Sequence, residues 1–172
     1  MIILHKFAKV KFKIMKLRKK IIVKTHYKVE PKHDWLKYWR VVRYWVSQSY
    51  GLSYPDLEML LFLYSEDLFS EHDFERFERI MSWDTHRFKR LVSGDWIVPW
   101  REKNGNEKAL YTLSFKGKRL INAVYKKLSG EEGITTHPSK NPIFRKDAGY
   151  IARGYRKMIL EMNEAIQKAK QY

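Results

Sequence analysis

The chain has 172 residues, of which 44% are hydrophobic, and this length suits one core of ordinary size with short flanking elements rather than two enzyme domains. It contains no cysteine, which excludes disulfides, thiol nucleophiles and the thiolate ligands of zinc fingers. The formal net charge of +16 predicts a polyanionic partner, because neutralising phosphates releases counterions and gives affinity without a shaped pocket.

Residues 1–32 are predicted to form a basic N-terminal arm, since they carry a net charge of +10, against +1 for residues 33–134 and +5 for residues 135–172. Within residues 10–14 apolar residues alternate with lysines, which favours a β-ribbon, with a helix as the alternative. Lysines interrupt the apolar stretches before they reach the length of a signal-peptide core, and no run approaches the ~18 apolar residues of a membrane span. We therefore expect an intracellular, cytoplasmic protein without a membrane partner, associated with the nucleoid when it binds DNA.

Four helices are predicted after the arm, each from an apolar stripe at helical spacing. They are expected at residues 35–50, 55–64, 71–81 and 83–93. Asp34, Ser70 and Ser82 are the expected N-caps of the first, third and fourth, with Asp73 completing a capping box after Ser70. Pro55 suits the first turn of the second helix, because its fixed φ is already helical.

Residues 96–114, WIVPWREKNGNEKALYTLS, are predicted to form a β-hairpin. Asn104-Gly105 is a strong signal for a two-residue type I′ turn, which needs positive φ at both central residues. Folding about this turn pairs Trp100 with Ala109 on an apolar face. Three cations are expected on the opposite face: Arg101, Lys103 and Lys108. A further helix is expected over residues 116–128.

Residues 131–146 are rich in Gly, Pro, Ser and Thr and are predicted to be a linker, and residues 147–172 are predicted to be a C-terminal helix. The helix carries a seam at alternating spacings of three and four residues. The seam is formed by Ile151, Tyr155, Met158, Met162, Ala165 and Ala169. It packs either on the 35–50 helix of the same chain or on a second copy of the protein in a homodimer.

The order of helices, hairpin and helix over residues 33–130 is that of a winged helix-turn-helix domain, in which the helix before the hairpin enters the major groove. The run LVSGDWIVPWREKNGNEKALYTLSFKGKRLI, residues 91–121, resembles the MarR family of transcription regulators. In that family a Leu-x-x-x-Gly-apolar-Ile phrase ends the recognition helix and a Leu-Thr/Ser-x-x-Gly phrase opens the next helix. Two positions depart from the pattern: Asp95 stands for the turn glycine, and Gly105-Asn106-Glu107 replaces the Asp-x-Arg of the wing.

The predicted fold class is therefore mainly α with a small β-hairpin: a winged helix-turn-helix domain with a basic N-terminal arm and a C-terminal helix. The MarR resemblance implies a homodimer held by the first and last helices. It also implies a small aromatic effector, which nothing in the sequence identifies.

The candidate DNA-contacting residues lie on the predicted recognition helix and on the wing. Arg and Lys donate to guanine O6 and N7, and Ser and Thr donate to bases or phosphates. The candidates on the helix are Ser82, Thr85, His86, Arg87, Lys89 and Arg90, and those on the wing are Arg101, Lys103 and Lys108. The alternative interpretation is a solvated basic helix face without a ligand.

No nucleophile–base, phosphate-loop or HExxH motif occurs, so we expect a protein that is not an enzyme and that has neither a metal nor a cofactor. His72 lies among acidic residues, but Glu75 and Arg79 have the spacing of a surface ion pair. The predicted function is a transcription regulator that binds double-stranded DNA. The alternative is a winged-helix interaction or structural module, with a protein partner, in a nucleoprotein or polymerase assembly. A third hypothesis is binding of RNA or single strands through the arm and the aromatic 35–50 helix.

Overall fold

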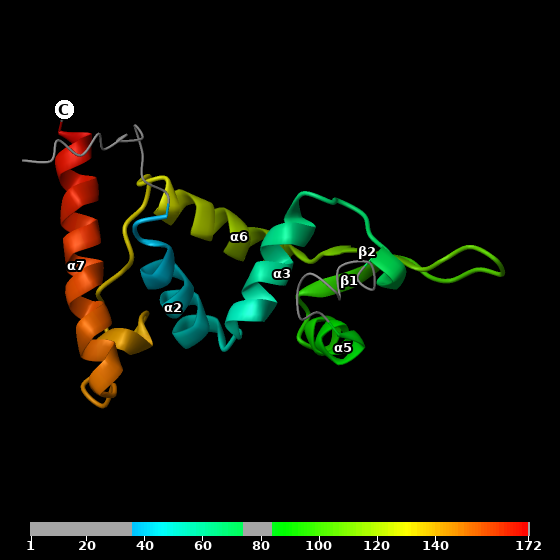
Figure 1. Ribbon diagram of the computed structural model, residues 1–172, viewed down its shortest axis with the longest axis horizontal. Coiled ribbons are helices and arrows are strands. Elements are labelled where there is room, and N and C mark those ends of the chain that lie inside the picture. Colours follow the sequence, from blue (N-terminus) through cyan, green and yellow to red (C-terminus); the bar gives the residue numbers. More distant parts are fainter. Residues whose placement is uncertain (1–35, 74–83, 172) are drawn as a thin grey trace, which may run out of the picture. The chain divides into compact units, whose positions relative to one another are not determined.

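The computed structural model describes residues 36–73 and 84–171, which form a mainly helical winged-helix fold with a two-stranded antiparallel hairpin (Figure 1). The predicted fold class is therefore confirmed. The chain divides into residues 1–32 and residues 33–172, and every described element belongs to the second unit. The predictions for the arm and for the Ser82 side chain lie outside the described residues. The helix predicted at residues 35–50 begins at Trp39, with Tyr38 as its N-cap, so the prediction of Asp34 as the cap was wrong. The elements are α2 (Trp39–Tyr50), α3 (Tyr54–Tyr64), α5 (Thr85–Ser93), β1 (Ile97–Arg101), β2 (Leu110–Leu113), α6 (Phe115–Leu128), the 3-10 helix η1 (Pro142–Phe144) and α7 (Tyr150–Lys170).

The helix ends follow local signals in the sequence. Gly51 ends α2 in the left-handed conformation with φ of 69°, which costs glycine nothing because it has no Cβ. Ser53 caps α3 by accepting a hydrogen bond from the backbone N–H of Asp56, and Pro55 occupies the first turn as predicted. Asp73 Oδ2 accepts from the Ser70 N–H and hydroxyl at 2.7 and 2.8 Å, which is the acidic half of the predicted capping box, in a helix described only to Asp73.

The start of the predicted recognition helix differs from the prediction. Its N-cap is Asp84, whose Oδ1 accepts a hydrogen bond from the Arg87 N–H at 2.5 Å, and not Ser82. The side chain of Asp84 reaches the third helical residue, and its charge suits the positive end of the helix dipole. Helix α5 therefore begins at Thr85, two residues later than expected.

The hairpin forms where it was predicted, but its register is shifted. Val98 pairs with Thr112 and Pro99 with Tyr111, and a β-bulge at Trp100 then lets Arg101 pair with Leu110. Because side chains alternate across a strand, a one-residue shift moves a side chain to the other face. Trp100, predicted on the apolar face opposite Ala109, is 58% exposed.

The turn of the hairpin explains the shift. Asn104 and Glu107 exchange backbone hydrogen bonds of 2.9 and 3.3 Å, so Gly105 and Asn106 are the two central residues, not Asn104 and Gly105. Gly105 has a φ of 54°, and Asn106 does not have positive φ. Positive φ at the first central position alone is the pattern of a type II′ turn, which favours glycine there.

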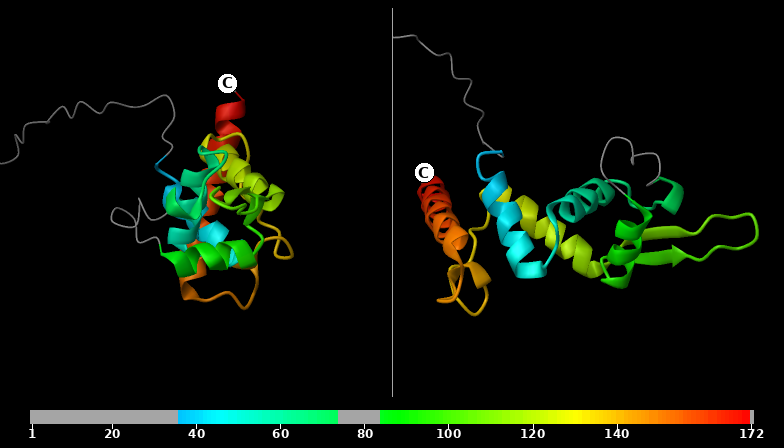
Figure 2. Two further views of the ribbon diagram at one scale, coloured as in Figure 1. Left: turned by 90° about the vertical axis from the view of Figure 1, so that its right-hand side faces the viewer. Right: turned by 60° about the horizontal axis from the view of Figure 1, so that its bottom comes forward.

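One hydrophobic core joins the helices to the hairpin. The buried side chains come from α2, α3, α5, α6, η1, α7, β1 and β2, and α3 contacts both α2 and α6 (Figure 2). Leu60, Leu91 and Ile121 are at most 1% exposed, and burying a side chain of this size contributes roughly 1.5–3 kcal/mol. This core fixes α5 and the hairpin against the rest of the domain.

The predicted linker is part of this core. Ile134 and Ile143 are 1% exposed, and the Asn163 side chain of α7 accepts from the Ile134 N–H and donates to its carbonyl. Buried Asn141 caps η1 and donates to the carbonyl of Thr135. Although Gly, Pro, Ser and Thr dominate residues 131–146, the two isoleucines and these amide hydrogen bonds dock the segment, which connects α6 to α7.

Helix α7 packs against α2 and η1 of the same chain, and the Tyr44 and Tyr155 rings stack with centroids 3.8 Å apart (Figures 1 and 2). The buried seam is rotated by one residue at several positions from the predicted one. It consists of Ala152, Ile159, Met162 and Ile166, with Tyr155 partly buried. Ile151, Met158, Ala165 and Ala169 of the predicted seam are exposed. Among the described helices, none is long and apolar enough to cross a membrane.

Candidate nucleic-acid interface

Helix α5 turns an apolar side toward the hairpin and a polar side toward solvent. Phe88 and Leu91 are buried, and the Phe88 ring meets the Tyr111 ring of β2 edge-on, with centroids 4.9 Å apart. These two contacts set the rotation of the helix about its axis. Thr85, His86 and Lys89 are consequently exposed.

These exposed side chains have no partner among the described residues. Within residues 36–73 and 84–171, no hydrogen bond, ion pair or ring contact is made by Thr85, His86 or Lys89. One cation, one imidazole and one hydroxyl on a single exposed helix face can donate to phosphates or to base edges. The structure thus presents three of the predicted site residues together, while Ser82 lies outside the described part of the chain.

Both arginines of α5 form ion pairs with a carboxylate on α3. Arg90 Nη2 donates to Asp56 Oδ1 at 2.7 Å, and Arg87 Nη1 lies 3.5 Å from the same oxygen. Asp56 is 4% exposed, so its carboxylate gives up most of its hydration and both guanidiniums compensate for the loss. The Arg87 side chain is 17% exposed and that of Arg90 is 59% exposed. Asp56 therefore engages both predicted site residues, of which Arg87 is largely buried and Arg90 is exposed.

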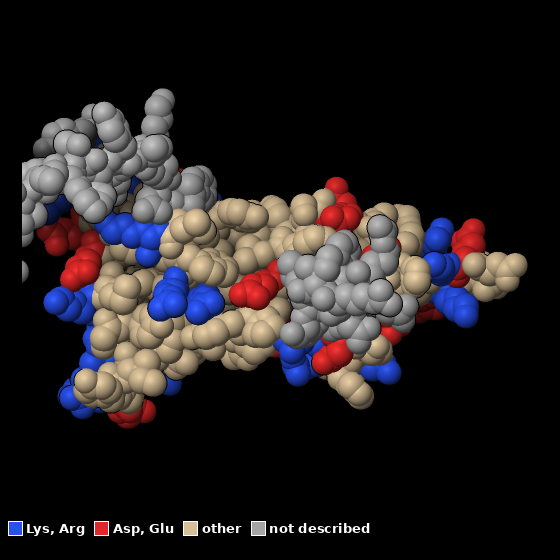
Figure 3. Space-filling model, in the orientation of Figure 1, with Lys and Arg blue, Asp and Glu red and all other residues tan. Residues whose placement is uncertain are grey.

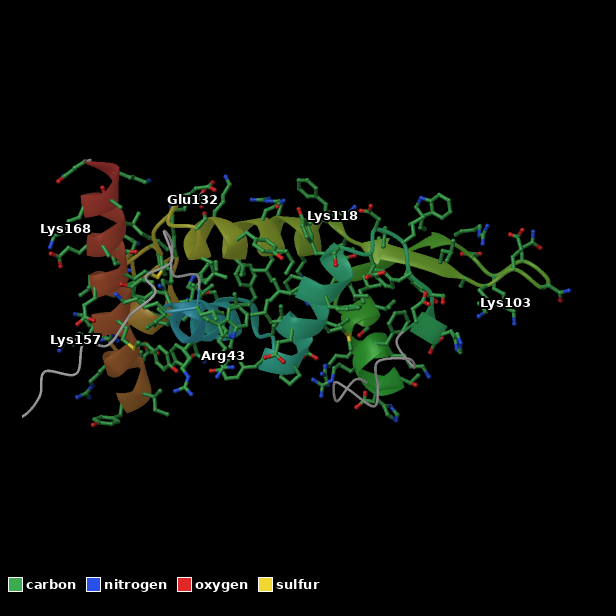
Figure 4. The ribbon with its side chains drawn as sticks, turned by 45° about the horizontal axis from the view of Figure 1, so that its top comes forward. Arg43, Lys103, Lys118, Glu132, Lys157 and Lys168 are labelled. Carbon is green, nitrogen blue, oxygen red and sulfur yellow. The ribbon has the colours of Figure 1, made fainter. Side chains whose placement is uncertain are left out.

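The wing, defined as β1, β2 and the residues between them, carries charges of both signs (Figure 3). Arg101 lies 3.1 Å from Glu107 Oε2 and donates to the carbonyl of Lys108 at 3.4 Å. Lys103 and Lys108 are exposed, and neither makes an ion pair with a described residue. Lys103 lies on the part of the hairpin far from α7 (Figure 4). The wing thus offers two unpaired lysines and one paired arginine.

A shallow hollow of about 320 Å³ lies at the base of the wing. The hollow lies between the two wing lysines and the start of the helix that follows Ser70. Its lining residues are Ser70, Glu71, His72, Lys103, Lys108, Ala109 and Tyr111. Glu71 reduces the positive potential at this place. Within residues 36–73 and 84–171, no group of three His, Asp or Glu side chains could hold a metal ion.

The junction between α5 and α6 accounts for the two phrases that resemble the MarR pattern. Asp95 adopts a φ of 58°, and its carbonyl accepts a hydrogen bond from Ser114 Oγ at 2.7 Å. The Ser114 hydroxyl also caps α6 by accepting from the Gly117 N–H. A Cβ at Gly117 would lie 2.9 Å from the Trp96 carbonyl oxygen, so glycine is needed where α6 approaches β1.

Sequence reasoning missed Asp56 and Lys116. Lys116 Nζ donates to the Gly94 carbonyl at 2.9 Å and lies 4.0 Å from the centroid of the Trp96 ring, which closes the C-terminal end of α5. Asp56 occupies the first turn of α3, where an acid is expected for the helix dipole alone. The only sequence signal for its second role is a carboxylate on a helix face that is otherwise apolar.

No family model matches the chain, and no curated protein matches it. Among solved structures, the chain is similar to AbfR, a staphylococcal MarR-like regulator, in a disulfide-formed state. The two share 17% sequence identity with a TM-score of 0.41 over 77% of this chain and 82% of that chain. This chain has no cysteine and therefore no counterpart of that disulfide. A similarity this distant does not show membership of the family.

Proposed function

We propose that the chain is a non-enzymatic transcription regulator of the MarR-like type that binds double-stranded DNA inside the cell. The observation that carries the proposal is the exposed set of Thr85, His86 and Lys89 on α5, next to the wing lysines, none of whose side chains has a partner among the described residues. In winged-helix proteins the corresponding helix enters the major groove and the wing reaches the adjacent backbone or minor groove.

Each exposed group has a role in this proposal. Lys89 donates to guanine or to phosphate, and Thr85 and His86 donate to bases or phosphates at the start of the helix. Lys103 and Lys108 hold the backbone, as does Arg101 when it leaves Glu107. Ser82 belongs to the same proposed contact set. The basic arm, residues 1–32, adds affinity that depends on salt.

Charge reversal of one lysine tests this interface. We expect Lys89→Glu to weaken duplex binding at least tenfold, because it removes a contact and adds repulsion by phosphate. Lys118→Glu is the matched control, since Lys118 is an exposed lysine on α6 (Figure 4). Fluorescence anisotropy with a labelled duplex measures both variants. Equal affinities for the two variants would remove α5 from the interface.

The proposal includes a homodimer formed through α7. Its support is an exposed apolar stripe with heptad spacing: Ile151 and Met158 are 66% and 39% exposed, and Ala165 is exposed one heptad later. Two α7 helices crossing antiparallel near Met158 bring Lys157 of one copy toward Glu161 of the other, both of which flank the stripe. Such a pairing is self-complementary, as twofold symmetry requires.

Light scattering at micromolar concentration tests the dimer. We expect the unmodified chain to be dimeric and Met158→Glu to be monomeric, because the substitution places a charge at the centre of the stripe. Leu160→Glu is the control, since Leu160 is 53% exposed on the same helix but on another side of it. A monomeric unmodified chain would overturn this part of the proposal.

The small aromatic effector implied by the MarR resemblance has a fitting hollow in the described residues. A space of about 330 Å³ between α2 and α6 is lined by Tyr50, Phe115, Lys116, Arg119, Leu120 and Ala123. Apolar walls and two cations suit an aromatic carboxylate. Titration calorimetry with benzoate, compared between the unmodified chain and Arg119→Gln, tests this assignment, and equal heats of binding would dismiss it.

A second candidate function is a winged-helix interaction module that binds a protein partner in a nucleoprotein or polymerase assembly. The observation that favours it is the pairing of Arg87, Arg90 and Arg101 with acids of the same chain, together with an exposed tryptophan, Trp100, on the wing. This module would keep its partner after deletion of residues 1–28 and substitution of Lys89, and it would select no DNA sequence. Loss of the partner in that variant would favour the regulator.

A further inference from the structure

Asp56 stands where α3 meets α5, and its position determines which cations α5 can offer. The carboxylate lies in the first turn of α3 and is 4% exposed. Its Oδ1 accepts a hydrogen bond from Arg90 at 2.7 Å and lies 3.5 Å from Arg87 Nη1. Lys89 lies between these arginines in sequence and has no such partner among residues 36–73 and 84–171. The same short helix therefore carries two engaged cations and one free cation.

We propose that Asp56 withholds Arg87 and Arg90 from DNA, so that α5 presents a lysine as its cation and the domain binds duplex largely by lysine–phosphate contacts, with low sequence selectivity. The inference rests on the proposed DNA-binding function and deepens it. Asp56 acts as a positioning residue, through the arginines, without touching DNA.

The energetic reason lies in the burial of the carboxylate. If Arg90 moved to a phosphate, Asp56 would keep a buried charge with only Arg87 near it, and an unpaired buried charge is costly. A DNA phosphate attracts Arg90 across water and salt, which screen the charges, whereas the buried Asp56 carboxylate attracts it with less screening. The ion pair therefore persists in the complex with DNA.

The pair on the wing behaves differently. The Arg101 and Glu107 side chains are 42% and 60% exposed, so separating them restores hydration to both groups. Exposed ion pairs contribute little to stability, and Arg101 can exchange Glu107 for a phosphate. Burial of the acid, and not of the arginines, distinguishes the two cases: the Asp56 side chain is 5% exposed and that of Glu107 is 60% exposed.

The consequence for specificity follows from side-chain chemistry. Arginine recognises guanine through two parallel hydrogen bonds to O6 and N7, which fix its geometry. Lysine carries a compact charge on a flexible stem and contacts phosphates with little directional preference. A recognition helix with both arginines engaged lacks the side chains best suited to select a base.

The salt dependence of duplex binding tests the inference, because each phosphate neutralised adds about 0.9 to the slope of log K against log salt. Asp56→Asn keeps the shape of the side chain and removes its charge. Glu58→Gln is the matched control, since Glu58 is exposed on the same helix, has no described partner and changes the net charge equally. Relative to the unmodified chain, we expect the slope of log K against log salt in Asp56→Asn to be steeper by about 0.9 for each arginine that is released to contact phosphate. We expect no such change in Glu58→Gln.

Arg90→Gln supplies an independent outcome if Asp56→Asn does not fold, which circular dichroism reports. In the otherwise unmodified chain, Arg90→Gln should leave the slope of log K against log salt unchanged. In the Asp56→Asn variant, Arg90→Gln should remove the increase in slope that comes from Arg90. A loss of about 0.9 from the slope in Arg90→Gln alone overturns it, because Arg90 then already contacts phosphate. Equal slopes for Asp56→Asn and Glu58→Gln overturn it as well. Absence of duplex binding by the unmodified chain would instead refute the proposed function.

Discussion

Gly117 shows how one residue links two elements of the domain. Its Cα faces the Trp96 carbonyl so closely that an added Cβ would lie 2.9 Å from that oxygen, a backbone atom that cannot rotate away. We expect Gly117→Ala to lower the free energy of unfolding, because overpacking costs about 1–3 kcal/mol and outweighs the ~1 kcal/mol that alanine gains in a helix.

Gly154→Ala is the control for Gly117→Ala, since a Cβ at Gly154, within α7, would meet nothing within 4 Å. This variant should be stabilised by up to about 1 kcal/mol. Urea denaturation of both variants measures the difference. If Gly117→Ala proved as stable as Gly154→Ala, the close approach of α6 to β1 would be wrong.

Lys127 gives a test at alkaline pH. Burial lowers the pKa of Lys127 below its ordinary value of 10.5, and Glu132, with Oε2 at 3.6 Å, offsets part of this shift. Between the lowered pKa and 10.5 the unfolded chain binds more protons than the folded chain, so the stability contributed at this position rises with pH. We expect the unmodified chain to gain stability relative to Lys127→Met as the pH rises toward 10.5, measured by urea denaturation. Parallel pH profiles would contradict the burial of this ammonium group.

At the scale of elements, the sequence predicted the order of the described long helices and the hairpin, because caps, apolar spacing and turn residues are local signals. It did not predict the hairpin register, since both Asn104-Gly105 and Gly105-Asn106 can occupy a two-residue turn and a bulge at Trp100 has no local signature. Nor did it predict the rotation of α7, which depends on Tyr44 and η1 as packing partners.

The corrected register predicts different roles for two tryptophans: Trp96, which directly precedes β1, and Trp100, which lies within it. Trp96 is 6% exposed and Trp100 is 58% exposed. We expect Trp96→Ala to cost about 3–5 kcal/mol in the free energy of unfolding and Trp100→Ala to cost little. Similar losses for the two variants, measured by chemical denaturation, would restore the register without a bulge.

The candidate site was also predicted only in part, because some of its interactions depend on tertiary contacts. The exposed face of α5 follows from its helical period, so Thr85, His86 and Lys89 could be named in advance. The pairing of Arg87 and Arg90 with Asp56 joins residues more than thirty positions apart, and no local pattern encodes it. Tertiary contacts thus decide which of several similar cations are free.

For the whole molecule, charge and fold are separated along the chain. Residues 1–32 carry a net charge of +10, while residues 54–134, which include α3, α5, the wing and α6, carry a net charge of −1. We expect deletion of residues 1–32 to weaken non-specific duplex binding and to reduce its dependence on salt, because fewer phosphates are neutralised. The melting temperature of residues 33–172 should change little, since this unit has its own core. A duplex affinity unaffected by the deletion would place the non-specific contacts elsewhere.

The central claim, that α5 and the wing hold duplex DNA, is tested most directly by selecting bound duplexes from a random pool at low and high salt. A regulator of the proposed type retains an enriched motif at high salt, palindromic if the protein is a dimer, and Lys89→Glu loses it. With Asp56 engaged as described, the motif should be short and weakly enriched. A pool that stays random at both salt concentrations, with equal recovery by the unmodified chain and Lys89→Glu, would contradict the claim.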